Sequence, residues 1–258
     1  MRLMKRILSA AAVLALSASL LVGCSSGTAS SVPVSASSAA ESTVSSVEET
    51  ASSAVDENEA AAAQLLNDLT GSYQELWPVI LADEYKQTWL DDCTALVGED
   101  NAEAAFEKLS SMVTGDVYGE DAVKAYANGG GAYFCGFTND LATLTFDGEA
   151  STISGTDKDG NELFSHPYHY IGMEPVRGLY EFESDDADSG EFTYFFLAPD
   201  TSAETYHIEF RYGSDADALG QYDAGDYAYW LASGISTDCD QTMIDNCIEL
   251  FCTENLAG

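Results

Sequence analysis

The chain has few basic residues. It contains 9 lysine and arginine residues in 258, against 44 aspartate and glutamate residues. Three of the nine precede Cys24 and every acidic residue follows it, so the remainder of the chain is strongly negative. Such a surface repels nucleic acids and anionic membrane surfaces, and we expect neither as a partner. The same charge favours solubility outside the cell and attracts cations.

Long hydrophobic runs are missing beyond the N-terminus. No run after Cys24 approaches the roughly 20 residues that a transmembrane helix needs. The one long run follows three basic residues and ends in Leu21-Val-Gly-Cys24, which is the pattern of a bacterial lipoprotein signal peptide. We therefore expect residues 1–24 to be a signal peptide with a lipidated Cys24, which anchors the protein to the extracytoplasmic face of the bacterial cell membrane. An uncleaved helical anchor is the less favoured alternative.

Aromatic residues are absent from residues 25–58. Ser, Ala, Thr, Val and Glu predominate there, and such a segment buries too little apolar surface to offset the entropy of ordering it. We expect a disordered tether that holds the rest of the chain away from the lipid surface. Residues 59–258 then form one domain, whose core is supplied by 14 Tyr, 11 Phe and 3 Trp.

Several motifs of enzymes are missing as well. The chain has no Cys-x-x-Cys, Gly-x-Ser-x-Gly or His-Glu-x-x-His motif, the patterns of thiol oxidoreductases, α/β hydrolases and zinc proteases. We expect a binding protein and no enzyme. The number of cysteines after Cys24 is odd, so at least one thiol is unpaired within the chain. The sequence leaves open which of them pair: Cys93, Cys135, Cys239, Cys247 and Cys252.

The patterns that are present indicate an α+β fold that is mainly β. Apolar residues at three- and four-residue spacing predict helices before and after a central region of short segments rich in Thr, Phe and Tyr. Asp147-Gly148 and Asp159-Gly160 predict hairpin turns between these segments, which form a meander or small barrel. The predicted helices cover residues 57–69, 72–90, 101–112 and 236–253.

One predicted strand includes a candidate metal site. Alternation places Tyr206, Ile208, Phe210 and Tyr212 on one face, and Thr205, His207, Glu209 and Arg211 on the other. His207 and Glu209 can reach one metal ion from that second face, and Asp200, near the end of the preceding strand, can supply a third ligand. A hydrogen-bonded surface histidine is the alternative interpretation of His207.

Five segments occur in an order typical of one known family. They are Leu69-Thr-Gly-Ser-Tyr-Gln-Glu-Leu-Trp-Pro78, Pro167-Tyr-His-Tyr-Ile-Gly172, Arg177-Gly-Leu-Tyr-Glu-Phe182, Tyr206-His-Ile-Glu-Phe-Arg-Tyr-Gly213 and Tyr227-Ala-Tyr-Trp230. With them, roughly residues 69–250 resemble the ZinT-like zinc-binding domain, which is also found at the C-terminus of AdcA-type zinc lipoproteins. The resemblance implies a lipocalin-like (calycin) antiparallel β-barrel with N-terminal helices and a C-terminal helix.

The resemblance also implies zinc binding, which in the family depends on three histidines. At the matching positions this chain has Asp200, Thr205 and His207, so one histidine remains. Oxygen ligands in place of nitrogen shift selectivity toward harder cations. Asp200 and Glu209 are the candidate replacements for the missing histidines.

Two functions are consistent with these patterns. The first is a cell-surface lipoprotein that binds a divalent metal ion, zinc before others, through His207, Asp200 and Glu209. It would capture the ion or deliver it to a metal-uptake transporter. The alternative is a metal-free, lipocalin-like module that binds a small apolar ligand or a protein partner.

Overall fold

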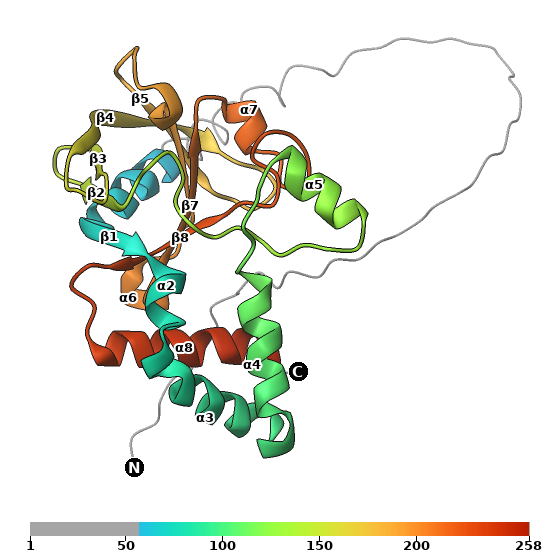
Figure 1. The fold of residues 1–258 in the computed structure, drawn as a ribbon. Helices are drawn as coiled ribbons and strands as arrows, with labels where there is room; N and C mark the ends of the chain where they lie inside the picture. Colours follow the sequence, from blue (N-terminus) through green and yellow to red (C-terminus); the bar gives the residue numbers. More distant parts are fainter. Residues whose placement is uncertain (1–56, 258) are drawn as a thin grey trace, which may run out of the picture. The chain divides into compact units, whose positions relative to one another are not determined.

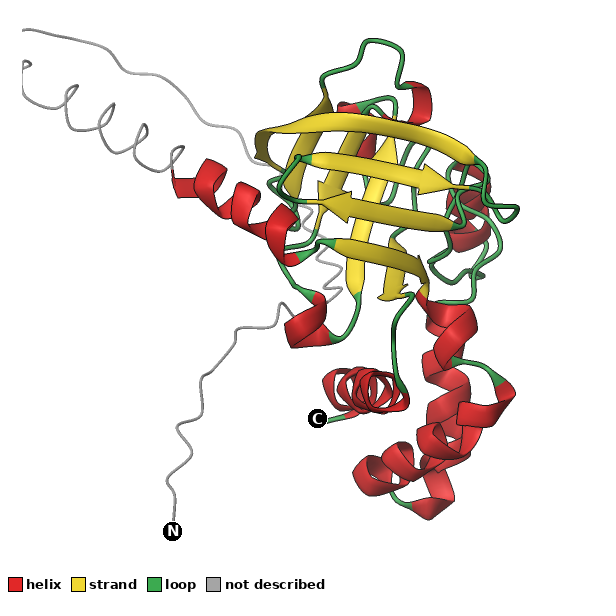
Figure 2. Ribbon diagram, turned by 90° about the vertical axis from the view of Figure 1, so that its left-hand side faces the viewer, coloured by secondary structure: helices red, strands yellow, loops and turns green. Residues whose placement is uncertain are grey.

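Eight antiparallel strands form a closed barrel in the computed structural model, which describes residues 57–257 (Figure 2). The expected signal peptide, Cys24 and almost all of the expected tether lie outside the described residues. Each strand pairs with its neighbours in the sequence, which confirms the expected antiparallel barrel. The strands are β1 (Gly71–Glu75), β2 (Thr143–Asp147), β3 (Thr152–Thr156), β4 (Glu162–Met173), β5 (Tyr180–Ser184), β6 (Tyr194–Leu197), β7 (Ile208–Gly213) and β8 (Ala232–Ser236).

The barrel closes at β1, which pairs with both β2 and β8. Tyr73 lies opposite Leu144 on one side and opposite Ser236 on the other. Both edges of β1 are therefore hydrogen-bonded within the sheet, and the full closure of the barrel removes the edges that strands otherwise expose.

The two predicted hairpin turns are present. Asp147-Gly148 begins the turn between β2 and β3, where the Asp147 carboxylate accepts a 3.1 Å hydrogen bond from the amide of Ala150. Gly160, with φ +80°, lies in the turn between β3 and β4. That positive φ strains any residue with a Cβ atom, so glycine suits the position.

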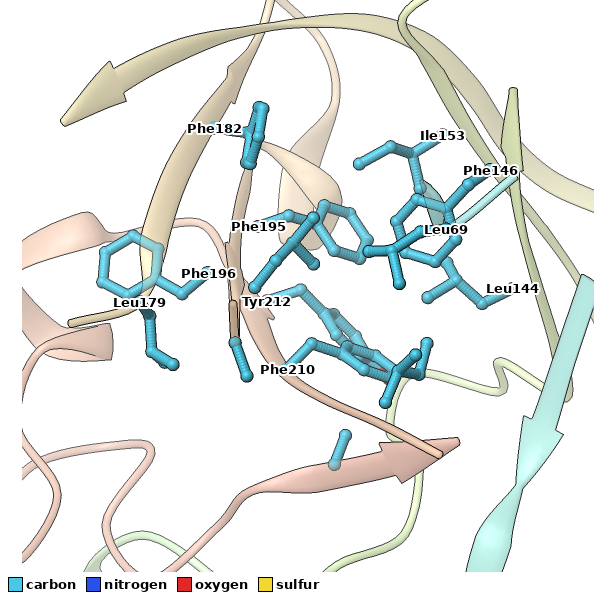
Figure 3. Packing of buried hydrophobic residues seen from close by; sticks show 14 of the residues in the cluster. Leu69, Leu144, Phe146, Ile153, Leu179, Phe182, Phe195, Phe196, Phe210 and Tyr212 are labelled. Carbon is cyan, nitrogen blue, oxygen red and sulfur yellow. The ribbon is translucent and has the colours of Figure 1, made fainter. Parts of the chain in front are cut away.

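Aromatic side chains fill the inside of the barrel (Figure 3). Alternate residues of each strand point inward, and in β4 this places Phe164 and Tyr168 in the core. Full burial of each large apolar side chain contributes roughly 1.5–3 kcal/mol, so this cluster dominates the stability of the barrel. At most 1% of the surface of each of the following is exposed: Phe146, Phe182, Phe195, Phe196, Phe210 and Tyr212.

Helices form a second core beside the barrel (Figure 1). Trp89 of α3 (Lys86–Val97), Leu109 of α4 (Glu99–Met112) and Ile248 of α8 (Gln241–Leu256) are fully buried there. The carboxylate of Asp240 caps α8 by accepting a 2.9 Å hydrogen bond from the amide of Met243. The helices of this layer are α2 (Leu76–Ile80), α3 (Lys86–Val97), α4 (Glu99–Met112) and α8 (Gln241–Leu256).

Shorter elements occupy the connections. They are a helical stretch over residues 57–68 before β1, the 3₁₀ helices η1 (Asp83–Tyr85) and η2 (Gly190–Phe192), α5 (Glu120–Ala127), α6 (Ser202–Thr205) and α7 (Ala216–Leu219). None of the helices within residues 57–257 is long and apolar enough to cross a membrane.

The predicted helix over residues 72–90 is wrong in its first part. Gly71–Glu75 is strand β1, and helical structure begins at Leu76 and is interrupted before α3. The leucine and isoleucine residues whose spacing suits a helix, Leu76, Ile80 and Leu81, lie in α2 or directly after it. Gly71–Glu75 contains neither residue type and is a strand because it pairs with β2 and β8. The last helix also begins later than predicted, at Gln241, because Ser236 is the final residue of β8.

Candidate functional site

The candidate site lies where β6 is connected to β7. Asp200 follows β6 and is exposed, and the single helical turn α6 then occupies Ser202–Thr205. Tyr206 has a left-handed backbone, with φ +65°, and the chain enters β7 only at Ile208. The predicted strand over residues 205–212 is therefore shorter than expected, because the α6 turn places Thr205 and Tyr206 outside it.

His207 is held by the backbone of the same turn. Its Nδ1 atom lies 2.7 Å from the carbonyl oxygen of Thr205, and the ring is half-buried. A carbonyl oxygen can only accept, so Nδ1 carries the proton of this hydrogen bond. In the neutral ring the lone pair is then on Nε2, which is the usual arrangement of a metal-binding histidine.

Cys247 of α8 lies near the same nitrogen of the His207 ring. Its sulfur is 3.9 Å from His207 Nδ1. Burial raises the pKa of the Cys247 thiol to about 12, so the thiol is protonated at neutral pH. Metal ions bind the thiolate, and Cys247 is therefore a packing neighbour of His207 and no ready ligand.

Glu254 of α8 adds a carboxylate that the sequence analysis missed. The pKa of its carboxyl is raised above the ordinary value, first by burial and then by the carboxylates of Glu209 and Asp200, whereas His207 acts in the opposite direction. Each of these three groups is therefore close enough to Glu254 to influence it. Cys247 and Glu254 are seven residues apart, two helical turns, which puts them on one face of α8. The spacing shows in the sequence that the two residues share a face of α8, but not that this face meets β7.

The four groups do not form a preassembled metal centre. Among residues 57–257, no three His, Cys, Asp or Glu side chains are arranged to hold a metal ion. The surrounding charge is suited to a cation, but the ligand atoms would have to move together to coordinate one.

The other two histidines are paired with carboxylates elsewhere on the barrel. Both are on β4, where His166 Nδ1 lies 2.8 Å from an oxygen of Asp186 and His169 Nδ1 lies 2.7 Å from an oxygen of Asp185. Asp185 and Asp186 directly follow β5. These two histidines tie that loop to β4.

Arg211 was expected on the polar face of β7 and is instead completely buried. Its guanidinium donates to the carbonyl oxygens of Leu219 and Tyr227, and its Cζ lies 4.5 Å from the centre of the Tyr222 ring. The carbonyl oxygens and the aromatic face replace the water that a charged side chain loses on burial. Arg211 thereby fastens the segment between α7 and β8 to the barrel.

Glu174 and Arg177 extend this arrangement around Tyr222. The hydroxyl of Tyr222 donates a 3.1 Å hydrogen bond to the buried carboxylate of Glu174, and Arg177 Cζ lies 4.3 Å from the Tyr222 ring centre. Glu174 also accepts from the amides of Val176 and Arg177. The Tyr222 hydroxyl and both carboxylate oxygens of Glu174 are paired within the fold, which indicates a structural role.

A shallow apolar groove lies outside the barrel. It has a volume of about 330 Å³ and contacts both α2 and the segment before β2. Its apolar lining includes Trp77, Pro78, Leu81, Val113 and Phe134.

Two solved structures have a similar fold. One is the Zn(II)-bound ZinT-like domain of AdcA from Streptococcus pneumoniae, with a TM-score of 0.45, 15% identity, and a match that covers 71% of this chain and 89% of that domain. The other is Zn(II)-bound AdcA from the same organism, with a TM-score of 0.42 and 14% identity. That match covers 70% of this chain and 34% of AdcA, so the chain spans about a third of it. No family model and no curated protein matches the sequence. At this identity the likeness concerns the fold alone.

Proposed function

We propose that this protein binds a divalent metal ion, zinc before others, beside the start of β7. The proposed ligands are His207, Asp200 and Glu209, to which we add Glu254. The observation that supports this most directly is the 2.7 Å hydrogen bond from His207 Nδ1 to the Thr205 carbonyl. It turns the ring into the tautomer that offers Nε2 to a metal.

The charges around His207 favour a cation. Repulsion from Glu209 and Asp200 contributes to the raised pKa of Glu254, so a bound cation would relieve that repulsion and favour the ionised carboxylate. Because the site is not preassembled, part of the binding free energy would be spent on bringing the side chains together. We expect weaker binding than in a site of three histidines.

The donor set also sets the expected selectivity. One imidazole nitrogen and several carboxylate oxygens suit Zn²⁺ and Mn²⁺, whereas Ca²⁺ prefers oxygen ligands alone. We expect Zn²⁺ to bind most tightly, Mn²⁺ less tightly and Ca²⁺ least.

The metal ion would be cargo. A lipid anchor at Cys24 would place the domain on the extracytoplasmic face of the bacterial cell membrane, where captured ions could pass to a metal-uptake transporter. The excess of acidic residues supports this role, since it raises the local concentration of cations.

A second function is supported by the groove beside Trp77. Its apolar lining and volume of about 330 Å³ suit a small apolar ligand or an apolar side chain of a protein partner. Such a ligand would bind outside the barrel, because aromatic side chains occupy the interior.

Calorimetric titration of the full chain with Zn²⁺, Mn²⁺ and Ca²⁺ tests the first proposal. We expect one Zn²⁺ per chain, and an affinity at least about tenfold lower in a His207→Ala variant, which corresponds to about 1.4 kcal/mol. His169→Ala is the matched control, since it removes a histidine that is paired with Asp185 on β4. Zinc affinity that is the same in wild type and His207→Ala would refute the proposed site.

A further inference from the structure

Two cysteines from distant parts of the sequence meet in the helical core. Cys93 is on α3 and Cys252 is on α8, 159 positions further along the chain. Their sulfur atoms lie 3.9 Å apart, which is about van der Waals contact, and neither residue has any exposed surface. The packing of α3 against α8 thus brings one specific pair of thiols together.

The other cysteine sulfurs have different neighbours. Cys135 Sγ lies 3.9 Å from the carbonyl oxygen of Tyr133, and Cys247 Sγ lies 3.9 Å from His207 Nδ1. Cys239 is half-buried in the loop between β8 and α8. Of the pairings that the odd number of cysteines leaves open, the structure favours that of Cys93 with Cys252.

We propose that Cys93 and Cys252 form a structural disulfide that joins α3 to α8. The S–S bond of a disulfide is about 2.05 Å long, so side-chain rotation and a small approach of the two helices must close the remaining gap. Each thiol loses one proton and the pair loses two electrons. The oxidant is the disulfide of a thiol–disulfide oxidoreductase, which takes up both protons and both electrons and leaves as a dithiol. Such oxidants act outside the cytoplasm, where the N-terminal pattern of this chain predicts that the domain resides.

Burial decides when this bond forms and how it behaves afterwards. Burial raises the pKa of both thiols, so in the folded protein they are protonated as well as inaccessible, and neither reacts readily. Exchange with an oxidoreductase must therefore precede the final packing of α8 on α3. Once the helices have packed, the same burial protects the disulfide from reductants in solution. We expect resistance to dithiothreitol in the native state and rapid reduction in urea.

Differential alkylation with peptide mapping tests the proposal directly. The full chain is unfolded and then refolded with reduced and oxidised glutathione. It is next denatured without reductant, and a first alkylating reagent labels the free thiols. Reduction then opens the disulfides, and a second alkylating reagent labels the thiols that they release. We expect the second label on Cys93 and Cys252 alone. The first label should be on Cys135, Cys239 and Cys247, and on Cys24 in a chain that carries no lipid. First label on both Cys93 and Cys252, or a disulfide between other cysteines, would overturn the proposal.

A comparison of melting temperatures tests for the same disulfide without chemical labelling. Reduction and refolding without oxidant should lower the melting temperature of the wild-type chain, because the disulfide restricts the unfolded state across a long loop. The Cys93→Ala variant should melt at a lower temperature than the oxidised wild type and should show no change on reduction. Cys239→Ala is the control and should keep the full effect of reduction. A melting temperature of the wild type that is unaffected by reduction and refolding would also contradict the proposal.

Discussion

The hydroxyl of Tyr212 makes two hydrogen bonds to the backbone of Thr138. It accepts from the Thr138 amide at 2.6 Å and donates to the Thr138 carbonyl oxygen at 2.9 Å. Tyr212, labelled in Figure 3, is on β7 with no exposed surface. Thr138 is in the long connection between α5 and β2. One buried side chain therefore supplies the acceptor for the Thr138 amide and, beside the Leu141 amide, a second donor to the Thr138 carbonyl oxygen.

Replacing Tyr212 with phenylalanine should lower the free energy of unfolding by about 1–3 kcal/mol, because the variant leaves the partly buried Thr138 amide without an acceptor and removes one of the two donors to the Thr138 carbonyl oxygen. Urea denaturation followed by circular dichroism measures the change. Tyr194→Phe is the control, since that hydroxyl bonds only a partly exposed carboxylate, Glu183, at 3.1 Å. Equal stability of Tyr212→Phe and wild type would show that the two Thr138 bonds contribute nothing.

Trp89 is expected to be the most sensitive position of the helical core. It is fully buried, its indole nitrogen donates a 2.7 Å hydrogen bond to the Ile80 carbonyl, and its ring packs against Phe106 and Phe251. Trp89→Ala should cost about 3–5 kcal/mol of stability through the cavity that it leaves. Trp89→Phe keeps part of the packing and should cost less. Urea denaturation checks this: the midpoint should be highest for wild type, lower for Trp89→Phe and lowest for Trp89→Ala. A lower midpoint for Trp89→Phe than for Trp89→Ala would contradict the prediction.

Asp92 should destabilise the native protein at neutral pH. Its pKa is raised first by burial and then by the carboxylates of Glu249, Asp245 and Asp91. A carboxyl with a raised pKa favours the native state below its ordinary pKa, and that contribution is lost as the pH rises through the native value. Asp92→Asn should therefore raise the melting temperature at pH 7 by about 1–2 °C, a modest value because the group is partly solvated.

The same variant should melt like wild type near pH 3, where Asp92 is protonated in both the folded and the unfolded state. Glu107→Gln, at an exposed position of α4, is the charge-matched control and should change the melting temperature little at either pH. A gain from Asp92→Asn that persists undiminished at pH 3 would mean that the charge is not its cause.

Glu254 should affect stability and metal binding in opposite directions. Because its pKa is raised, the ionised form costs native stability above that pKa, and Glu254→Gln should raise the melting temperature of the metal-free protein at pH 7. The variant also removes a proposed ligand, so its Zn²⁺ affinity in calorimetry should fall several-fold. Glu249→Gln, on the same helix, should leave Zn²⁺ affinity unchanged. Unaltered zinc affinity in Glu254→Gln would remove Glu254 from the site.

The barrel was predictable because its signals are local. The dipeptides Asp147-Gly148 and Asp159-Gly160 mark turns by their own backbone preferences, and the inward residues Ile208, Phe210 and Tyr212 alternate as a strand requires. Strand β1 was missed because Gly71–Glu75 has no such local pattern. Its conformation depends on β2 and β8, whose residues are remote in the sequence.

The surroundings of His207 were predictable only in part. The residues on its own segment, Asp200 and Glu209, were identified, but Cys247 and Glu254 come from α8, and no sequence pattern says which face of α8 meets β7. The prediction that Arg211 lies on an exposed polar face was wrong for a related reason. Alternation predicts an outward side chain, and only the later segment around Tyr222 and Tyr227 covers it.

The pairing of β1 with β8 affects the order in which the molecule can be completed. Gln74 lies opposite Ile235, so β1 can pair along this edge only after β8 has been synthesised. Until then one edge of β1 has no partner strand. A product that stops before Ala232 would present β1 and β7 with open backbone groups, which are templates for pairing with other chains. Incomplete chains should therefore aggregate or be degraded, and they should not persist as partly working copies.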